Sequence, residues 1–155
     1  ILSFTSHDFR DMCPEVKYAQ ELINMAAKKY PDVKFHFCNA INAMQKAENL
    51  TLNYSSLEIV PEIDMNKNSA FIHIKARNDI FGTQPFFVFK TVTGNYVWDN
   101  LDYGNNPREW TYVFDDKTIC INAIEEIGVA VNSPGGMTEI ALYKVQDKKD
   151  EHYFL

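Results

Sequence analysis

Cysteine, glycine and proline are all scarce in this sequence, whose 155 residues include 3 Cys, 6 Gly and 6 Pro. The three cysteines lie far apart and form no Cys-x-x-Cys pair, which argues against a disulfide framework or a structural zinc site. We expect their thiols to be buried as small apolar groups. No apolar run approaches the roughly 18 residues of a membrane span. We therefore expect no membrane partner. Acidic residues outnumber basic ones, with a net charge of −6, so we do not expect nucleic acid as a partner either.

The first fifty residues alternate between strand and helix patterns. Residues 1–5 are a short apolar run, and residues 33–37 alternate apolar with polar side chains, so each segment predicts a strand. Between them, apolar residues recur every three or four positions from Pro14 to Tyr30, which predicts an amphipathic helix. Asn39 is a suitable N-cap for a second helix. This order predicts a parallel, right-handed βαβ unit followed by a helix. Parallel sheets are buried on both faces, so we expect its remaining strands elsewhere.

From residue 51 onward the helical period gives way to short alternating segments separated by turn residues such as Gly94-Asn95. Seven strands are expected, over residues 52–60, 70–77, 85–91, 95–99, 110–114, 118–132 and 138–146. Residues 86–89 predict a central strand, and residues 148–151 predict a frayed tail. The predicted fold class is therefore α+β, with an N-terminal βαβα segment over residues 1–50 and a C-terminal antiparallel β-sandwich over residues 51–155.

The opening segment, Ile-Leu-Ser-Phe-Thr-Ser-His-Asp, is an apolar strand that ends in His7-Asp8. It resembles the final motif of the catalytic barrel in the polysaccharide deacetylase family. The helix, strand and helix that follow come in that family's order, so the resemblance covers about a third of the chain. It implies the C-terminal end of a deacetylase-type barrel, and the chain, which opens without Met, is expected to be cut from a longer hydrolase of acetylated sugars. The implied partners are carbohydrate and the protein's own upstream barrel.

The resemblance implies a catalytic role for His7 alone. A histidine at the C-terminal end of a barrel strand suits the general acid that protonates the leaving amine; the alternative is a structural histidine at a strand end. Thr5-Ser6 replaces the family's usual leucine, which lines the acetyl pocket. The family binds its metal with an Asp-Asp pair and a His-x-x-x-His pair, both upstream of this final motif. The chain has no His-x-x-x-His, and its one Asp-Asp pair, Asp115-Asp116, lies in the C-terminal half, which does not resemble the barrel. We therefore expect no metal or other cofactor in this inactive piece, and a divalent metal in the parent.

The second half carries a cluster of aromatic and polar residues between positions 96 and 112. Aromatic rings stack on sugars, and carboxylates bind their hydroxyls, so Trp98, Asp99, Tyr103 and Trp110 are candidates for substrate binding. The alternative is that both tryptophans are core residues of adjacent strands and Asp99 belongs to a turn. Two other functions remain open: a non-catalytic module whose sandwich binds carbohydrate or packs on its own catalytic domain, or an interaction protein with an accidental resemblance.

Overall fold

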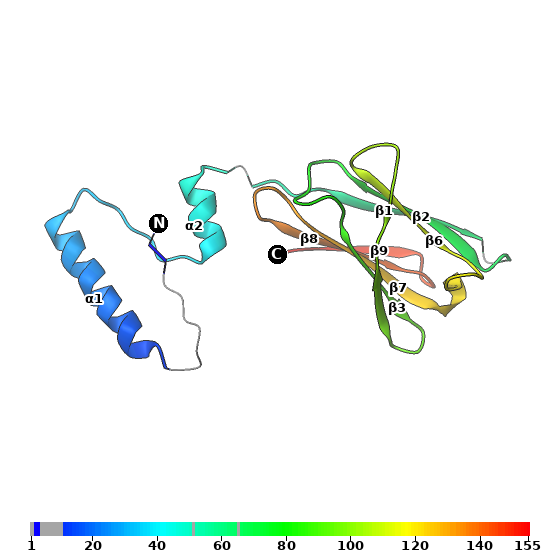
Figure 1. Ribbon diagram of the computed structural model, residues 1–155, viewed down its shortest axis with the longest axis horizontal. Helices are drawn as coiled ribbons and strands as arrows, with labels where there is room; N and C mark the ends of the chain where they lie inside the picture. Colours follow the sequence, from blue (N-terminus) through cyan, green and yellow to red (C-terminus); the bar gives the residue numbers. More distant parts are fainter. Residues whose placement is uncertain (1, 4–10, 51, 65) are drawn as a thin grey trace. The chain divides into compact units, whose positions relative to one another are not determined.

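The computed structural model describes residues 2–3, 11–50, 52–64 and 66–155. The chain divides into two compact units, Ile1–Asn49 and Leu50–Leu155, which are described one at a time. Among the described residues, the first unit contains the two α-helices, and the second contains the β-strands (Figure 1). The structure thus has the mixed α+β composition that the sequence predicts.

The N-terminal unit contains helices α1 (Cys13–Lys29) and α2 (Ala40–Ala47). Both occur where the sequence predicts helices. The Asn39 side chain caps α2 as expected, because its Oδ1 accepts a hydrogen bond from the Asn42 backbone N–H at 2.8 Å. That bond satisfies one of the donors left unpaired at a helix start. In the described part of the chain, no helix combines the length and the apolar character needed to cross a membrane.

The strand predicted over residues 33–37 does not form. This segment pairs with no strand in the described chain, and the Phe35 and Phe37 side chains are exposed. Alternating polarity is not sufficient for a strand, since its backbone groups also need a neighbouring strand with which to form hydrogen bonds. Most of the other predicted strand, residues 1–5, lies outside the described residues. The expected burial of the thiols is also wrong, because Cys13 and Cys38 are exposed and Cys120 is half-buried.

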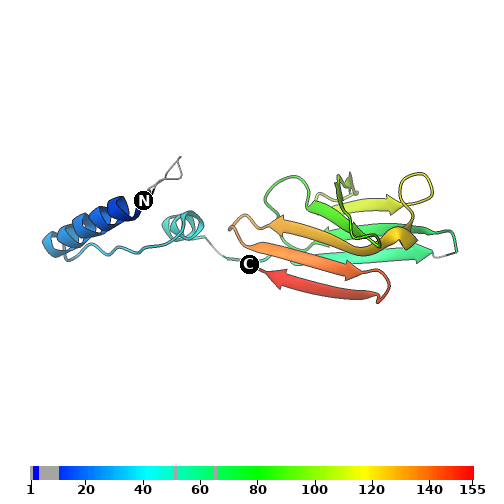
Figure 2. The same ribbon diagram turned by 90° about the horizontal axis from the view of Figure 1, so that it is seen from below.

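The second unit consists of two antiparallel sheets packed face to face. The four-stranded sheet has the order β1 (Leu57–Asp64), β2 (Ser69–Ala76), β6 (Glu109–Phe114) and β5 (Asp102–Tyr103). The five-stranded sheet has the order β4 (Tyr96–Asp99), β3 (Phe86–Thr91), β7 (Ile124–Asn132), β8 (Thr138–Lys144) and β9 (Lys149–Phe154). A short 3-10 helix, η1 (Ile121–Ala123), precedes β7. In Figure 2 the last three strands, coloured yellow-orange to red, run side by side.

Each of the seven predicted strands corresponds to a strand of the sandwich, with shifted ends. The predicted segment 118–132 is a strand only over β7. The central position predicted for residues 86–89 is confirmed, since β3 lies between β4 and β7. The expected fraying of residues 148–151 is wrong, because β9 pairs with β8 over its whole length. The two-residue strand β5 was not expected, since its pattern is too short to read from the sequence.

The core lies between the two sheets, where alternate residues of facing strands meet. The Phe87 ring lies 4.6 Å from the Tyr112 ring, and the Phe89 ring lies 5.2 Å from the Phe114 ring, centre to centre. These pairs join β3 of one sheet to β6 of the other, in the tilted and edge-on arrangements that aromatic rings prefer. The outer faces of both sheets are thereby left as surface.

Candidate functional site

The predicted sugar-binding residues do not form one site. Trp98 lies on β4, the edge strand of the five-stranded sheet, and its side chain is 68% exposed. It stands opposite Val88, whose neighbours Phe87 and Phe89 face the core, so Trp98 lies on the outer face of that sheet. Tyr103 lies on β5, the edge strand of the other sheet, and is also exposed. The two rings therefore belong to different sheets.

The other two predicted residues serve the structure of the sandwich. Trp110 is only 1% exposed, and its indole N–H donates a hydrogen bond to the Thr83 carbonyl oxygen at 3.2 Å. No sugar can stack on a ring that is buried in this way, so Trp110 is removed from the candidate site. The Asp99 carboxylate accepts a hydrogen bond from the Tyr112 hydroxyl at 2.8 Å. The pKa of Tyr112 is raised, first by burial and then by this carboxylate, so its hydroxyl remains a donor.

The candidate catalytic residue, His7, lies outside the described residues, as do Thr5, Ser6 and Asp8. Asp115 forms a turn, in which its Oδ1 accepts hydrogen bonds from the Lys117 and Thr118 backbone N–H groups at 2.9 Å each. Within residues 2–3, 11–50, 52–64 and 66–155, no group of three or more His, Cys, Asp or Glu side chains is placed to hold a metal ion.

A larger apolar surface surrounds Trp98 on the outer face of the five-stranded sheet. The strand register places two rows of side chains across the strands, and together we call them the apolar band. One row contains Trp98, Val88, Gly128 and Leu142 and ends at the charged Glu151 on β9, and the next contains Phe86, Ala130, Ile140 and Tyr153. Phe86 is 56% exposed and Tyr153 is 47% exposed. The sequence analysis missed both, because Phe86 belongs to an apolar run typical of a core strand and Tyr153 follows the predicted frayed tail.

Gly128 lies at the centre of the apolar band, where an added side chain would be crowded. A Cβ atom there would lie 3.1 Å from Val88 Cγ1 and 3.2 Å from Leu142 Cδ2. These two apolar side chains from the neighbouring strands therefore close over the glycine backbone. The floor of the band is a continuous apolar surface at this point, not a hole.

Charged side chains border the apolar band on one side, and most of them are paired with one another. Lys90 Nζ lies 2.8 Å from Glu125 Oε1. Glu151 Oε1 lies 3.0 Å from Lys144 Nζ and 3.3 Å from Lys149 Nζ. Hydrogen bonds from Lys144, Tyr153 and Lys149 lower the pKa of the Glu151 carboxyl to about 2, so it is ionised at neutral pH. On the other side, the Thr138 hydroxyl donates to Asn132 Oδ1 at 2.7 Å.

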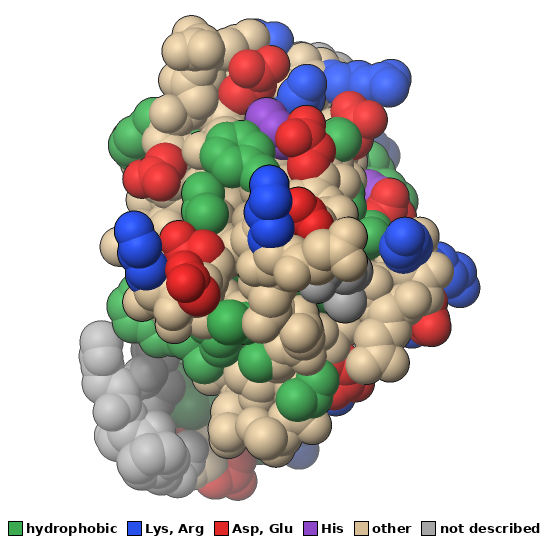
Figure 3. Space-filling model, turned by 90° about the vertical axis from the view of Figure 1, so that its right-hand side faces the viewer, with side chains coloured by type: hydrophobic (Ala, Val, Ile, Leu, Met, Phe, Trp, Pro, Cys, Tyr) green, Lys and Arg blue, Asp and Glu red, His purple; other side chains and the backbone are tan. Residues whose placement is uncertain are grey.

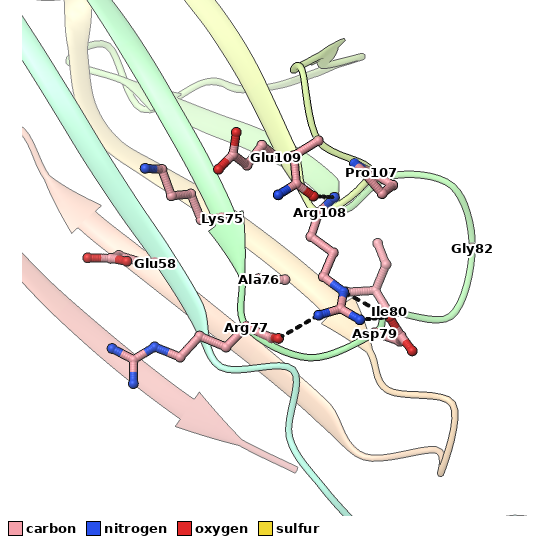
Figure 4. A pocket seen from close by; sticks show the side chains of 11 residues that line it. Glu58, Lys75, Ala76, Arg77, Asp79, Ile80, Gly82, Pro107, Arg108 and Glu109 are labelled. Carbon is pink, nitrogen blue, oxygen red and sulfur yellow. Dashed lines mark hydrogen bonds and ion pairs between the residues drawn. The ribbon is translucent and has the colours of Figure 1, made fainter.

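A separate pocket of about 610 Å³ lies between the segment after β2 and the start of β6. Its charged lining includes the Arg108 guanidinium, whose Nη2 lies 2.7 Å from Asp79 Oδ1 and whose Nη1 donates to the Arg77 carbonyl oxygen at 3.0 Å (Figure 4). The Arg77 side chain extends away from this pair (Figure 4). Acidic and basic groups are mixed in the lining, and they are also mixed on the face that Figure 3 shows.

Comparison with known proteins adds no relative to these observations. No protein-family model, no curated protein and no solved structure matches the chain. The comparisons therefore neither support nor contradict the deacetylase resemblance of the first fifty residues.

Proposed function

We propose that the β-sandwich is a non-catalytic carbohydrate-binding module whose ligand rests on the apolar band. The observation that carries this proposal is the exposure of the Trp98 indole on the outer face of the sheet. Tryptophan is highly buried on average in folded proteins, so an indole left in solvent indicates a contact with a partner. Tyr96, on the same strand and the same face, is 70% exposed.

The chemistry of this surface suits a sugar better than a nucleic acid. A pyranose ring has an apolar C–H face that can stack on an aromatic ring, and hydroxyls around its edge that need hydrogen-bond partners. The apolar band offers rings, and the polar side chains on either border offer donors and acceptors. A nucleic acid would instead require unpaired Lys and Arg side chains, whereas Lys90 and Lys144 are paired with carboxylates.

The experiment that tests this function is binding of soluble polysaccharides by Trp98→Ala, with Tyr103→Ala as the matched control. Affinity electrophoresis through gels that contain each polysaccharide provides the screen, and calorimetry measures the dissociation constant. We expect Trp98→Ala to weaken binding about tenfold or more, as removal of a central aromatic contact does. Tyr103→Ala should bind normally, because Tyr103 lies on the other sheet. Retention by no polysaccharide, or unchanged binding by Trp98→Ala, would contradict the proposal.

The N-terminal unit supports a proposal about the whole protein, namely a polysaccharide-deacetylase-like hydrolase in which an upstream barrel completes this unit. Among residues 2–3 and 11–50, no residue is buried, although the unit has large apolar side chains such as Val16, Leu22 and Ile41. A unit without a core of its own is stabilised by burial against another domain. The divalent metal of such an enzyme would be held by upstream residues.

The same whole-protein proposal gives His7 the role of general acid. In the protein extended upstream, His7→Ala should lower kcat roughly 10²–10⁴-fold, the usual contribution of a positioned proton donor. Metal content should not change, since a group that protonates the leaving amine is not a ligand. An effect on KM alone would indicate that His7 binds substrate instead.

A further inference from the structure

We infer that the ligand is an uncharged polysaccharide chain that lies across the strands, from β4 to β9, along the whole apolar band. This inference rests on the proposed function and adds two properties to it, the length of the ligand and its charge. Each follows from a separate observation on the outer face of the five-stranded sheet.

The shape of the apolar band indicates an extended chain and not a single sugar. Five strands about 4.8 Å apart place β4 and β9 roughly 19 Å from each other. The two rows of the band are two residues apart along each strand, which is about 7 Å. Exposed rings stand at both ends, Trp98 on β4 and Tyr153 on β9. A ligand that uses both rings must span the sheet, and a mono- or disaccharide is too short to do so.

The floor between the two rings is continuous enough to support a chain. Val88 and Leu142 close over Gly128 and join the two halves of the band. Ala130 and Ile140 continue the apolar surface in the second row, toward Tyr153. No charged side chain interrupts these rows on β3, β7 or β8. On β9 the first row ends at Glu151 and the second at Tyr153, so successive sugar rings can rest on the sheet along a path from Trp98 to Tyr153.

The border of the band determines which charge the ligand carries. Its lysines and glutamates are equal in number: Lys90, Lys144 and Lys149 against Glu125, Glu126 and Glu151. Lys90 is paired with Glu125, and Glu151 is shared by the other two lysines. A uronate or a free amino sugar would have to lose hydration beside a balanced border in which five of the six charges already have partners. A neutral sugar, including an N-acetylated one, does not bear this cost.

The first test compares ligands on the unmodified 155-residue chain by calorimetry. The neutral probes are hexamers of N-acetylglucosamine, glucose, mannose and xylose, each with its dimer, and the charged probes are hexamers of glucosamine and galacturonate. We expect at least one neutral hexamer to bind tenfold or more tightly than its dimer and than both charged hexamers. A dimer that binds as tightly as its hexamer, or a preference for a charged hexamer, would overturn the inference and leave the proposed function intact. Binding of none of the probes would count against both.

The second test uses variants at the far end and in the middle of the band. Tyr153→Ala should weaken binding of the hexamer about tenfold and leave binding of the dimer unchanged. Tyr153→Phe is the matched control, because it keeps the ring and removes only the hydroxyl that donates to Glu151 Oε2 at 2.9 Å. Ala130→Lys, which places a charge in the middle of the band, should also weaken only the hexamer. Near-ultraviolet circular dichroism verifies that each variant is folded. Loss of binding in Trp98→Ala but not in Tyr153→Ala would show that the ligand contacts one end only.

Discussion

Replacing Glu139 with alanine should strongly destabilise the sandwich, because this buried carboxylate holds the chain at the start of β1. Glu139 lies on β8 and is 1% exposed. Its Oε2 accepts a hydrogen bond from the Ser56 backbone N–H, and its Oε1 accepts one from the Leu57 backbone N–H, each at 2.8 Å. Ser56 has a φ of 54°, a conformation that a non-glycine residue adopts at a cost. The carboxylate thus links β8 of the five-stranded sheet to the start of β1 in the four-stranded sheet, where the Ser56 backbone is strained.

The size of the effect follows from the two hydrogen bonds. A hydrogen bond to a charged group contributes about 1.5–3 kcal/mol, so the loss of both costs about 3–6 kcal/mol. Leu57 is itself buried, so water cannot readily replace the lost acceptor. A domain of this size has about 5–15 kcal/mol of stability in total. Because each 1 kcal/mol lowers Tm by about 4–8 °C, the melting temperature should fall by at least about 12 °C.

Thermal and urea unfolding followed by circular dichroism measure this change. Glu125→Ala is the matched control, because it removes a carboxylate from a surface ion pair and should cost no more than about 1 kcal/mol. Glu139→Gln should lie between the two, since its amide keeps one acceptor oxygen and presents a donor to the other N–H. Equal unfolding midpoints for Glu139→Ala and Glu125→Ala would refute the reasoning that this carboxylate anchors β1.

Three further predictions concern the core, the ion cluster and the two units. Trp110→Ala should cost about 3–5 kcal/mol, the usual loss for a buried tryptophan, as measured by urea unfolding. The pKa of Glu151, about 2, lies below the ordinary 4.5. The ionised carboxylate should therefore contribute fully to stability above about pH 4.5, and this contribution should be lost as the pH falls toward 2. In Lys144→Met, an NMR titration of the Glu151 carboxyl should have a higher midpoint. Hydrogen exchange should be slower in β3 than in residues 34–37, and equal rates would contradict the absence of a strand there.

The sequence predicted the sandwich well because its strands carry the local signals of a half-buried sheet. In β2 the alternation of Ile72 and Ile74 with His73 marks one inward and one outward face, as the structure shows. The hairpin between β3 and β4 was also predictable, because Gly94-Asn95 separates two apolar runs. In the structure Gly94 has a φ of 83°, a conformation that glycine adopts readily. Each of these features depends on residues that are close together in the chain.

The candidate site was harder to predict because it depends on which strands become neighbours. Trp98 and Trp110 look alike in the sequence, as aromatic residues of short strands. Only the pairing shows that Trp110 lies on an interior strand and faces the other sheet, while Trp98 lies on an edge strand and faces outward. Tyr153 joins the same surface only because β9 pairs with β8. No local pattern contains this information.

The order of the strands also determines how the sandwich can fold. β2 is paired with β6, and the chain between them contains β3 and β4, which belong to the other sheet. In turn, β3 is paired with β7, and the chain between these two contains β5 and β6 of the first sheet. Completing either sheet therefore requires the closure of a long loop, and that loop contains strands of the other sheet. We expect the two sheets to form in one slow cooperative step, and a chain cut back to either sheet alone to remain unfolded.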